Sequence, residues 1–197
     1  MSSAWLLSLA GFSIATSITP GPNNMMLLAS GVNFGFARSL WHVAGISFGF
    51  LALLLAVGTG IGAALEAYPQ LHRALTFAGA AYLAYLAYRI ATADTLHEAG
   101  GKDRPMTFVE AALFQWVNPK AWVMALTGMA VYGVADRPFL GVVVIAGVFA
   151  LLNAPSVAVW AGLGAALRTY LSDPARLKWF NRAMGALLLL SVAPMVI

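Results

Sequence analysis

The amino-acid sequence predicts an all-α membrane protein with six transmembrane helices in a 3+3 inverted repeat, and three observations carry this prediction. Hydrophobic residues make up 61% of the 197 residues and charged residues 9%, whereas a soluble domain carries about 25% charged residues. Apolar stretches of about 18 residues or more, which are typical of spanning helices, recur along most of the chain. Proline motifs interrupt two of these stretches at matching places, so we expect the first and fourth helices to be broken there.

The first span is expected over 4–36 and holds the motif Thr19–Asn24 (TPGPNN) near its centre. Its length exceeds the roughly 20 residues that a helix needs to cross a bilayer, which favours two half-helices. Proline removes a backbone donor and displaces the carbonyl four residues earlier, so Pro22 would free that of Ile18. The helix restarting near Asn23 would expose N–H groups at a positive dipole end. We expect a binding site here; a simple proline kink is the structural alternative.

The second and third spans, 39–65 and 74–93, have features that favour helix packing and a membrane interface. Gly45 and Gly49 are one helical turn apart, as are Gly31 and Gly35 in the first span, and such pairs permit close helix packing. Tyr82, Tyr85 and Arg89 share one face of the third span. An interfacial aromatic belt with an arginine reaching the headgroups explains this series best.

The fourth span, 107–134, is interrupted by Asn118-Pro119-Lys120. Pro119 follows Pro22 by 97 positions, and the same offset places Gly128 on Gly31. Corresponding interruptions in the two halves of a membrane protein indicate a transporter binding site. Lys120 lies about 13 residues, or roughly 20 Å, into this span. A charge at that depth is costly and indicates function, either binding a substrate carboxylate or holding backbone carbonyls; a side chain that reaches the headgroups is the alternative.

The fifth and sixth spans are expected over 139–167 and 178–197. Asn153 and Pro155 interrupt the fifth span in the sequence. Asn153 is expected either to line the same cavity as the proline motifs or to form hydrogen bonds across helices. Both interpretations place a polar side chain inside the helix bundle.

The distribution of Lys and Arg predicts the orientation of the spans. One set of connections holds eight basic residues, against Arg73 and Arg137 on the opposite side. We therefore expect both termini outside and the basic connections in the cytoplasm, so that the second half inserts upside down relative to the first. The chain is expected to be a single transporter domain, 1–197, with repeats over about 4–93 and 107–197 joined by a cytoplasmic linker, 94–106. The eight basic residues are Arg38, Arg89, Lys102, Arg104, Arg168, Arg176, Lys178 and Arg182.

Several classes of function lack their chemistry in this sequence. The chain has no Cys, its three His are dispersed, and its seven acidic residues lie in connections or near span ends, with Glu110 the closest to a core. No GxxxxGK[ST] run for direct ATP use occurs, and no nucleophile–base set lies within a span. We therefore expect no catalytic or metal-binding residues, no cofactor, no nucleic-acid partner and no enzymatic activity. An exporter of metal or inorganic ions on a related scaffold is the alternative to a transporter of small zwitterions.

The two motifs resemble the LysE/RhtB amino-acid exporter family. The stretch Thr19–Met26 with Ser30-Gly31 is similar to its N-terminal signature, and Phe114–Trp122 is similar to its second characteristic stretch. The resemblance, which covers nearly the whole chain, implies a bacterial inner-membrane protein of six helices. It would export amino acids or close derivatives, with coupling to protons and alternating access, and cysteine, O-acetylserine or homoserine-type substrates fit best.

The expected binding site combines residues from both halves around a small zwitterionic substrate. Backbone donors near Asn23 and Asn24, helped by Lys120, would hold the carboxylate, and the carbonyls freed by Pro22 and Pro119 would hold the amine. The lipid bilayer is the other expected partner, and glycine-rich faces permit a homodimer without requiring one. The candidate substrate-binding residues are Pro20, Gly21, Pro22, Asn23, Asn24, Asn118, Pro119, Lys120 and Asn153.

Overall fold

The computed structural model describes residues 1–62, 67–93, 96 and 104–191, and this part of the chain is helical without a strand. Within the described residues, three helical stretches are long and apolar enough to cross a membrane: Phe36–Ile61, Arg73–Ala91 and Pro138–Leu167. The all-α, apolar character is thus confirmed, while the six-span inverted repeat stays a prediction. The elements are α1 (Ser3–Ile18), α2 (Pro22–Phe34), α3 (Phe36–Ala56), η1 (Val57–Ile61), α5 (Pro69–Ala91), α6 (Phe108–Phe114), η2 (Gln115–Val117), α7 (Pro119–Tyr132), α8 (Pro138–Leu167), η3 (Tyr170–Ser172) and α9 (Pro174–Leu190).

Proline marks the start of five helices: α2, α5, α7, α8 and α9. The first turn of a helix tolerates proline because a backbone N–H at that position would have no partner inside the helix. The proline ring also fixes φ near its helical value. Two helices begin earlier than the sequence predicted, α5 at Pro69 and α9 at Pro174. Asp173 explains the early start of α9, because its side chain accepts a hydrogen bond from the backbone N–H of Arg176 at 2.9 Å.

Asn153 and Pro155 interrupt the apolar sequence of the fifth span, but they do not break its helix. Helix α8 runs unbroken from Pro138 to Leu167 with Pro155 inside it. Membrane helices tolerate internal proline where neighbouring groups satisfy the freed backbone. Next to Pro155, the hydroxyl of Ser156 donates to the carbonyl of Leu152 at 2.7 Å, a hydrogen bond within the same helix.

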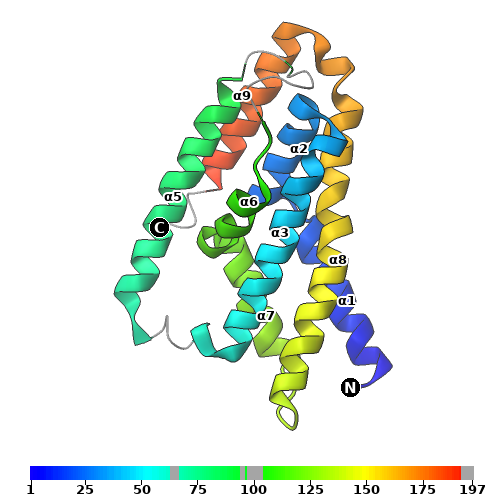
Figure 1. The fold of residues 1–197 in the computed structure, drawn as a ribbon, viewed down its shortest axis with the longest axis vertical. Helices are drawn as coiled ribbons and strands as arrows, with labels where there is room; N and C mark the ends of the chain where they lie inside the picture. The colour runs from blue at the N-terminus through cyan, green and yellow to red at the C-terminus, as the bar shows by residue number, and fades with distance from the viewer. Residues whose placement is uncertain (63–66, 94–95, 97–103, 192–197) are drawn as a thin grey trace.

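The helices of the two halves pack against one another along the long axis of the molecule (Figure 1). Helix α8 runs along most of this axis, with α1 beside its lower part and α2 beside its upper part, and α6 lies above α7. Helix α2 packs on α8, α3 packs on α6 and α8, and α5 packs on α9. Each of these contacts joins one half of the sequence to the other. The segments 94–95, 97–103 and 192–197, which include most of the predicted linker and the end of the sixth span, lie outside the described residues.

Glycines set the closest helix contacts. A Cβ on Gly31 in α2 would meet the backbone carbonyl of Ala161 in α8, and one on Gly164 in α8 would meet that of Leu28. Gly49 in α3 lies in the same way against the backbone of α6. Gly35 differs from the predicted packing role, because its φ of 85° forms the turn between α2 and α3. Side chains other than glycine rarely adopt this left-handed conformation.

The apolar core between α1, α3, α7 and α8 is rich in aromatic side chains. Phe149 is fully buried and meets Phe12 and Phe50 in edge-on contacts, with ring centroids 5.9 and 5.6 Å apart. Tyr132 closes this cluster, because its hydroxyl donates to the carbonyl of Ser8 at 3.1 Å. This packing holds α1 against α7 and α8, which belong to the second half of the chain.

Candidate functional site

The two proline motifs meet at the starts of α2 and α7. Helix α1 ends at Ile18 and α2 begins at Pro22, while α7 begins at Pro119 after the 3-10 turn η2. The ammonium group of Lys120 donates to the carbonyl of Thr19 and, at 3.4 Å, to that of Pro20. A lysine from one half of the chain therefore binds the segment that joins α1 to α2 in the other half.

Local geometry explains why Lys120 reaches these carbonyls. Asn118 caps α7, since its side-chain oxygen accepts a hydrogen bond from the backbone N–H of Lys120 at 3.1 Å. Gly21 leaves room for the lysine chain, because a Cβ at that position would lie 2.7 Å from Cδ of Lys120. The carbonyls of Thr19 and Pro20 lie outside helical hydrogen bonding, so they are available as acceptors.

Asn23 and Asn24 extend the contact between the halves at the first turn of α2. Asn23 Nδ2 donates to Gln115 Oε1 at 2.8 Å, and Gln115 Nε2 donates back to Asn23 Oδ1 at 3.1 Å. Asn24 Nδ2 donates to the carbonyls of Ser17 and Thr19 at 2.9 and 2.8 Å. The side-chain oxygen of Asn24 is buried and has no hydrogen-bond partner among the described residues, so this part of the site can accept a further donor.

Asn153 joins the same group of residues from α8. Its Nδ2 donates to Ser17 Oγ at 3.1 Å, and its Oδ1 accepts from Ser47 Oγ at 3.4 Å. The sequence left open whether Asn153 lines the cavity or bonds across helices, and in the structure it does both. We call these residues the polar cluster: Ser17, Gly21, Asn23, Asn24, Gln115, Asn118, Lys120 and Asn153, all of which line one small cavity.

The polar cluster is closed in this structure. Its cavity measures about 20 Å³, which is room for about one water molecule and too little for an amino acid. The two carbonyls expected to be free also have partners: that of Ile18 accepts from Trp160 Nε1 at 3.1 Å, and that of Gln115 accepts from the backbone N–H of Asn118 at 3.4 Å. Binding of a substrate here requires the helix ends to move apart.

The structure brings most of the predicted residues together. Six of the nine line the small cavity, Pro20 supplies a carbonyl to Lys120, and Pro22 and Pro119 begin the two helices. Sequence reasoning missed Ser17, Ser47 and Gln115. A polar side chain inside an apolar helix was the available signal, because such residues in membrane helices hydrogen-bond across helices.

A second, larger cavity lies between α2, α3, α5 and the segment that leads into α6. It has a volume of about 470 Å³. Tyr82, Tyr85 and Arg89, which the sequence assigned to a lipid interface, line this cavity; their place relative to the interface stays a prediction. Among the described residues, no group of three His, Asp or Glu side chains lies close enough to hold a metal ion.

Loss of the side chain of Asn153 should destabilise the contact between α1, α3 and α8. Asn153→Leu removes two cross-helix hydrogen bonds, and we expect the free energy of unfolding to fall by about 0.5–2 kcal/mol. Ser156→Ala is the matched control, because the side-chain hydrogen bond of Ser156 among the described residues lies within α8. Thermal melts of the two purified variants check the prediction, and equal melting temperatures would contradict it.

Comparison of the sequence with known proteins finds a family model that matches most of this chain. The sequence model of the LysE type translocator matches residues 14–195. Proteins of Escherichia coli (strain K12) and Shigella flexneri serotype 5b (strain 8401), each described as a cysteine/O-acetylserine efflux protein, are 36% identical over 122 residues. The aligned part covers 61% of this chain and 62% of each relative, so the chain spans about three-fifths of the length of these relatives. No solved structure matches this chain.

Proposed function

Because the chain belongs to the LysE type translocator family, we propose that it exports small neutral amino acids or their derivatives across the membrane. The multi-pass inner-membrane location follows from the family and from the apolar helices. The relatives described as cysteine/O-acetylserine efflux proteins favour short polar side chains in the substrate. They do not favour the alternative of a metal-ion exporter. The contact of Lys120 with the carbonyls of Thr19 and Pro20 is the observation that carries the proposed mechanism.

In this mechanism, Lys120 occupies the place of the substrate's amine while the polar cluster is closed. Its ammonium group has the same charge and donor number as the α-ammonium of an amino acid. On binding, the substrate amine displaces Lys120 from the carbonyls of Thr19 and Pro20. Lys120 then pairs with the substrate carboxylate, together with the backbone N–H groups at the first turn of α2 beside Asn23 and Asn24. The exchange keeps every charge partnered during a step in which water is scarce.

The membrane arrangement belongs to the same proposal. Six spans over 1–197 form one domain of two inverted repeats, with α1–α2 and α6–α7 as the broken first and fourth spans. The occurrence of Pro22 and Pro119 in the first turn of α2 and α7 supports the correspondence. The basic residues favour periplasmic termini, and we propose alternating access driven by the proton gradient. A homodimer is compatible with this arrangement.

Export is tested by feeding amino acids as dipeptides to cells with and without overexpression of the protein. We expect lower intracellular accumulation of one or two small neutral amino acids, with matching release into the medium. The Lys120→Ala variant, produced at the same membrane level, serves as the control for effects of overexpression. Unchanged accumulation of all twenty amino acids would overturn the proposed substrate class.

A further inference from the structure

The larger cavity has the position and polarity of a site in its own right. Residues near the ends of α2 and α5, such as Phe34 and Ala93, line this cavity. The segment Arg104–Met106, which leads into α6, also lines it. These ends lie at the upper end of the molecule in Figure 1, where the chain passes from α2 to α3 and from α8 to α9. The connections from α2 to α3 and from α8 to α9 are among the basic connections that the sequence assigns to the cytoplasm. With about 470 Å³, the cavity falls in the range of small-molecule sites, about 300–1,000 Å³.

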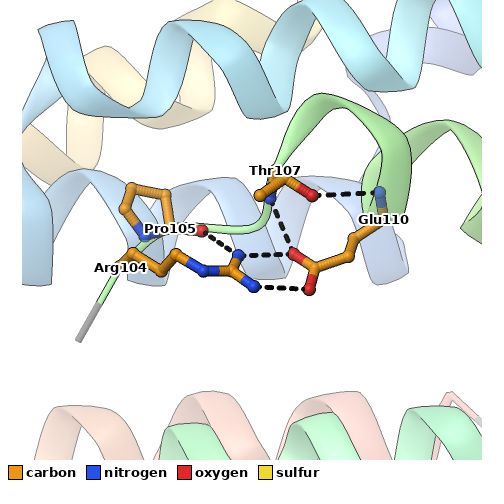
Figure 2. A network of polar contacts seen from close by, with 4 residues as sticks. All are labelled: Arg104, Pro105, Thr107 and Glu110. Atoms are coloured by element: carbon orange, nitrogen blue, oxygen red, sulfur yellow. Dashed lines mark hydrogen bonds and ion pairs between the residues drawn. The ribbon is translucent and has the colours of Figure 1, made fainter. Parts of the chain in front are cut away.

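An ion pair stands on one wall of the cavity, where Arg104 and Glu110 face each other with two parallel hydrogen bonds (Figure 2). Arg104 Nη1 donates to Glu110 Oε2 at 2.7 Å, and Nη2 donates to Oε1 at 2.8 Å. Hydrogen bonding to Glu110 raises the pKa of Arg104, so its guanidinium stays charged. The side chains are 55% and 38% exposed. An accessible pair of opposite charges is complementary to a molecule that carries both an ammonium and a carboxylate group.

His42 is a second feature of the cavity that indicates a bound ligand. Its side chain is 1% exposed and lines the cavity, and neither ring nitrogen has a hydrogen-bond partner among the described residues. Neighbouring polar side chains do have partners: Ser30 bonds to Ser39 at 2.7 Å, and Asn33 donates to Asn181 Oδ1 at 3.0 Å. A buried polar group without a partner is costly, and in a functional site a bound ligand satisfies it.

We infer that this cavity is a second substrate site, in which the Arg104–Glu110 pair separates to bind the carboxylate and ammonium of an α-amino acid and His42 hydrogen-bonds its polar side chain. The inference rests on the proposed function, because it names the place where the exported molecule first binds. Met26 and Phe114 are both buried and belong to one apolar cluster. Met26 lines the cavity and lies within one helical turn of Asn23 in the polar cluster, so the two sites follow one another along α2.

The ion pair also has a structural role, and the chain offers a variant that separates the two roles. Glu110 forms a capping box with Thr107: its Oε2 accepts from the backbone N–H of Thr107 at 2.8 Å, and Thr107 Oγ1 accepts from that of Glu110 at 3.2 Å (Figure 2). Glutamine at this position retains a capping box. Glu110→Gln therefore removes the charge and keeps the start of α6.

The test uses the absence of cysteine from the chain. A single Ala93→Cys places a thiol in the cavity wall, and its rate of reaction with a small maleimide is measured in the purified full-length protein in lipid nanodiscs. We expect serine to slow labelling severalfold. Glu110→Gln and Arg104→Gln, each added to Ala93→Cys, should raise the protecting concentration of serine about tenfold or more, because each removes a charge-assisted contact. Arg137→Gln, an exposed charge at the start of α8, is the control and should change nothing.

The role of His42 has its own readout in the same assay. Serine should protect at a lower concentration than alanine, and His42→Phe should abolish this difference while both still protect. Protection by serine that both charge variants leave unchanged would overturn the inference, as would a serine preference that survives in His42→Phe. Export of an amino acid by cells, together with labelling of the Ala93→Cys protein that no amino acid slows, would reject this second site and leave the proposed function standing. Protection without export would leave an amino-acid binding site in this cavity and reject the proposed export, and the absence of both would reject the two together.

Discussion

Replacement of Lys120 by alanine is expected to abolish export while the protein level in the membrane stays normal. Lys120 is the charged group that bridges the two halves at the polar cluster, through the carbonyls of Thr19 and Pro20. A hydrogen bond to a charged group contributes about 1.5–3 kcal/mol, so loss of one such contact in the transport step corresponds to a rate about 10- to 100-fold lower. Because Lys120 also receives the substrate carboxylate in the proposed mechanism, we expect at least the larger value, which leaves no measurable export.

Two further lysine variants sharpen this prediction. Lys178→Ala removes an exposed lysine from α9 and should leave export unchanged. Lys120→Arg keeps the charge but replaces a compact ammonium with a planar guanidinium, so partial export is expected. Rates of release into the medium, divided by the amount of protein in the membrane, give the comparison. Export by Lys120→Ala equal to that of the unmodified protein would remove Lys120 from the mechanism.

Replacement of Gly31 by alanine is expected to prevent normal packing of α2 on α8. The added Cβ would overlap the backbone carbonyl of Ala161, and its distances to the backbone nitrogen of Ala165 and the carbonyl carbon of Ala161 would be 2.9 and 3.0 Å. Backbone atoms cannot rotate away as a side chain can, so the helices must separate. Overpacking costs about 1–3 kcal/mol and occasionally more, and we expect the upper end of this range or above it.

The control for this effect lies on the partner helix. Gly147 in α8 has nothing within 4 Å of an added Cβ, so Gly147→Ala should be neutral or slightly stabilising. This expectation follows from the higher helix propensity of alanine, worth up to about 1 kcal/mol. Melting temperatures of the purified proteins and their yields from membranes measure the difference. Equal stability of the two variants would show that α2 and α8 are not packed through Gly31.

The sequence predicted the all-α, apolar character and the starts of several helices because proline, length and apolar composition act locally, whereas the six-span repeat stays a prediction. All five proline-started helices begin within a few residues of an expected boundary, since proline is accommodated in the first turn. Pro155 shows the limit of this local signal. A proline alone does not reveal whether the neighbouring helices satisfy the backbone groups that it frees, and in α8 the helix continues through it.

The sequence predicted most residues of the candidate site, but it did not predict which of their side chains contact one another. The offset between Pro22 and Pro119 placed Asn23, Asn118 and Lys120 in one site, and these three residues line the same small cavity. Which donor binds which acceptor depends on side-chain geometry across helices, so neither the pairing of Asn23 with Gln115 nor the contact of Trp160 with Ile18 could be predicted. The larger cavity was missed because it forms where α2 and α3 meet α5 and α6, which lie much later in the sequence.

Efflux from proteoliposomes tests the central claim most directly, namely that this chain moves a small amino acid through the polar cluster that Lys120 closes. Vesicles that contain labelled O-acetylserine and equal amounts of the unmodified protein or Lys120→Ala are compared with protein-free vesicles. The account predicts rapid loss of label with the unmodified protein, and loss with Lys120→Ala no faster than from protein-free vesicles. Equal efflux from the two protein preparations would contradict the assigned site, and efflux from neither above the protein-free level, with cysteine giving the same result, would contradict the transport itself.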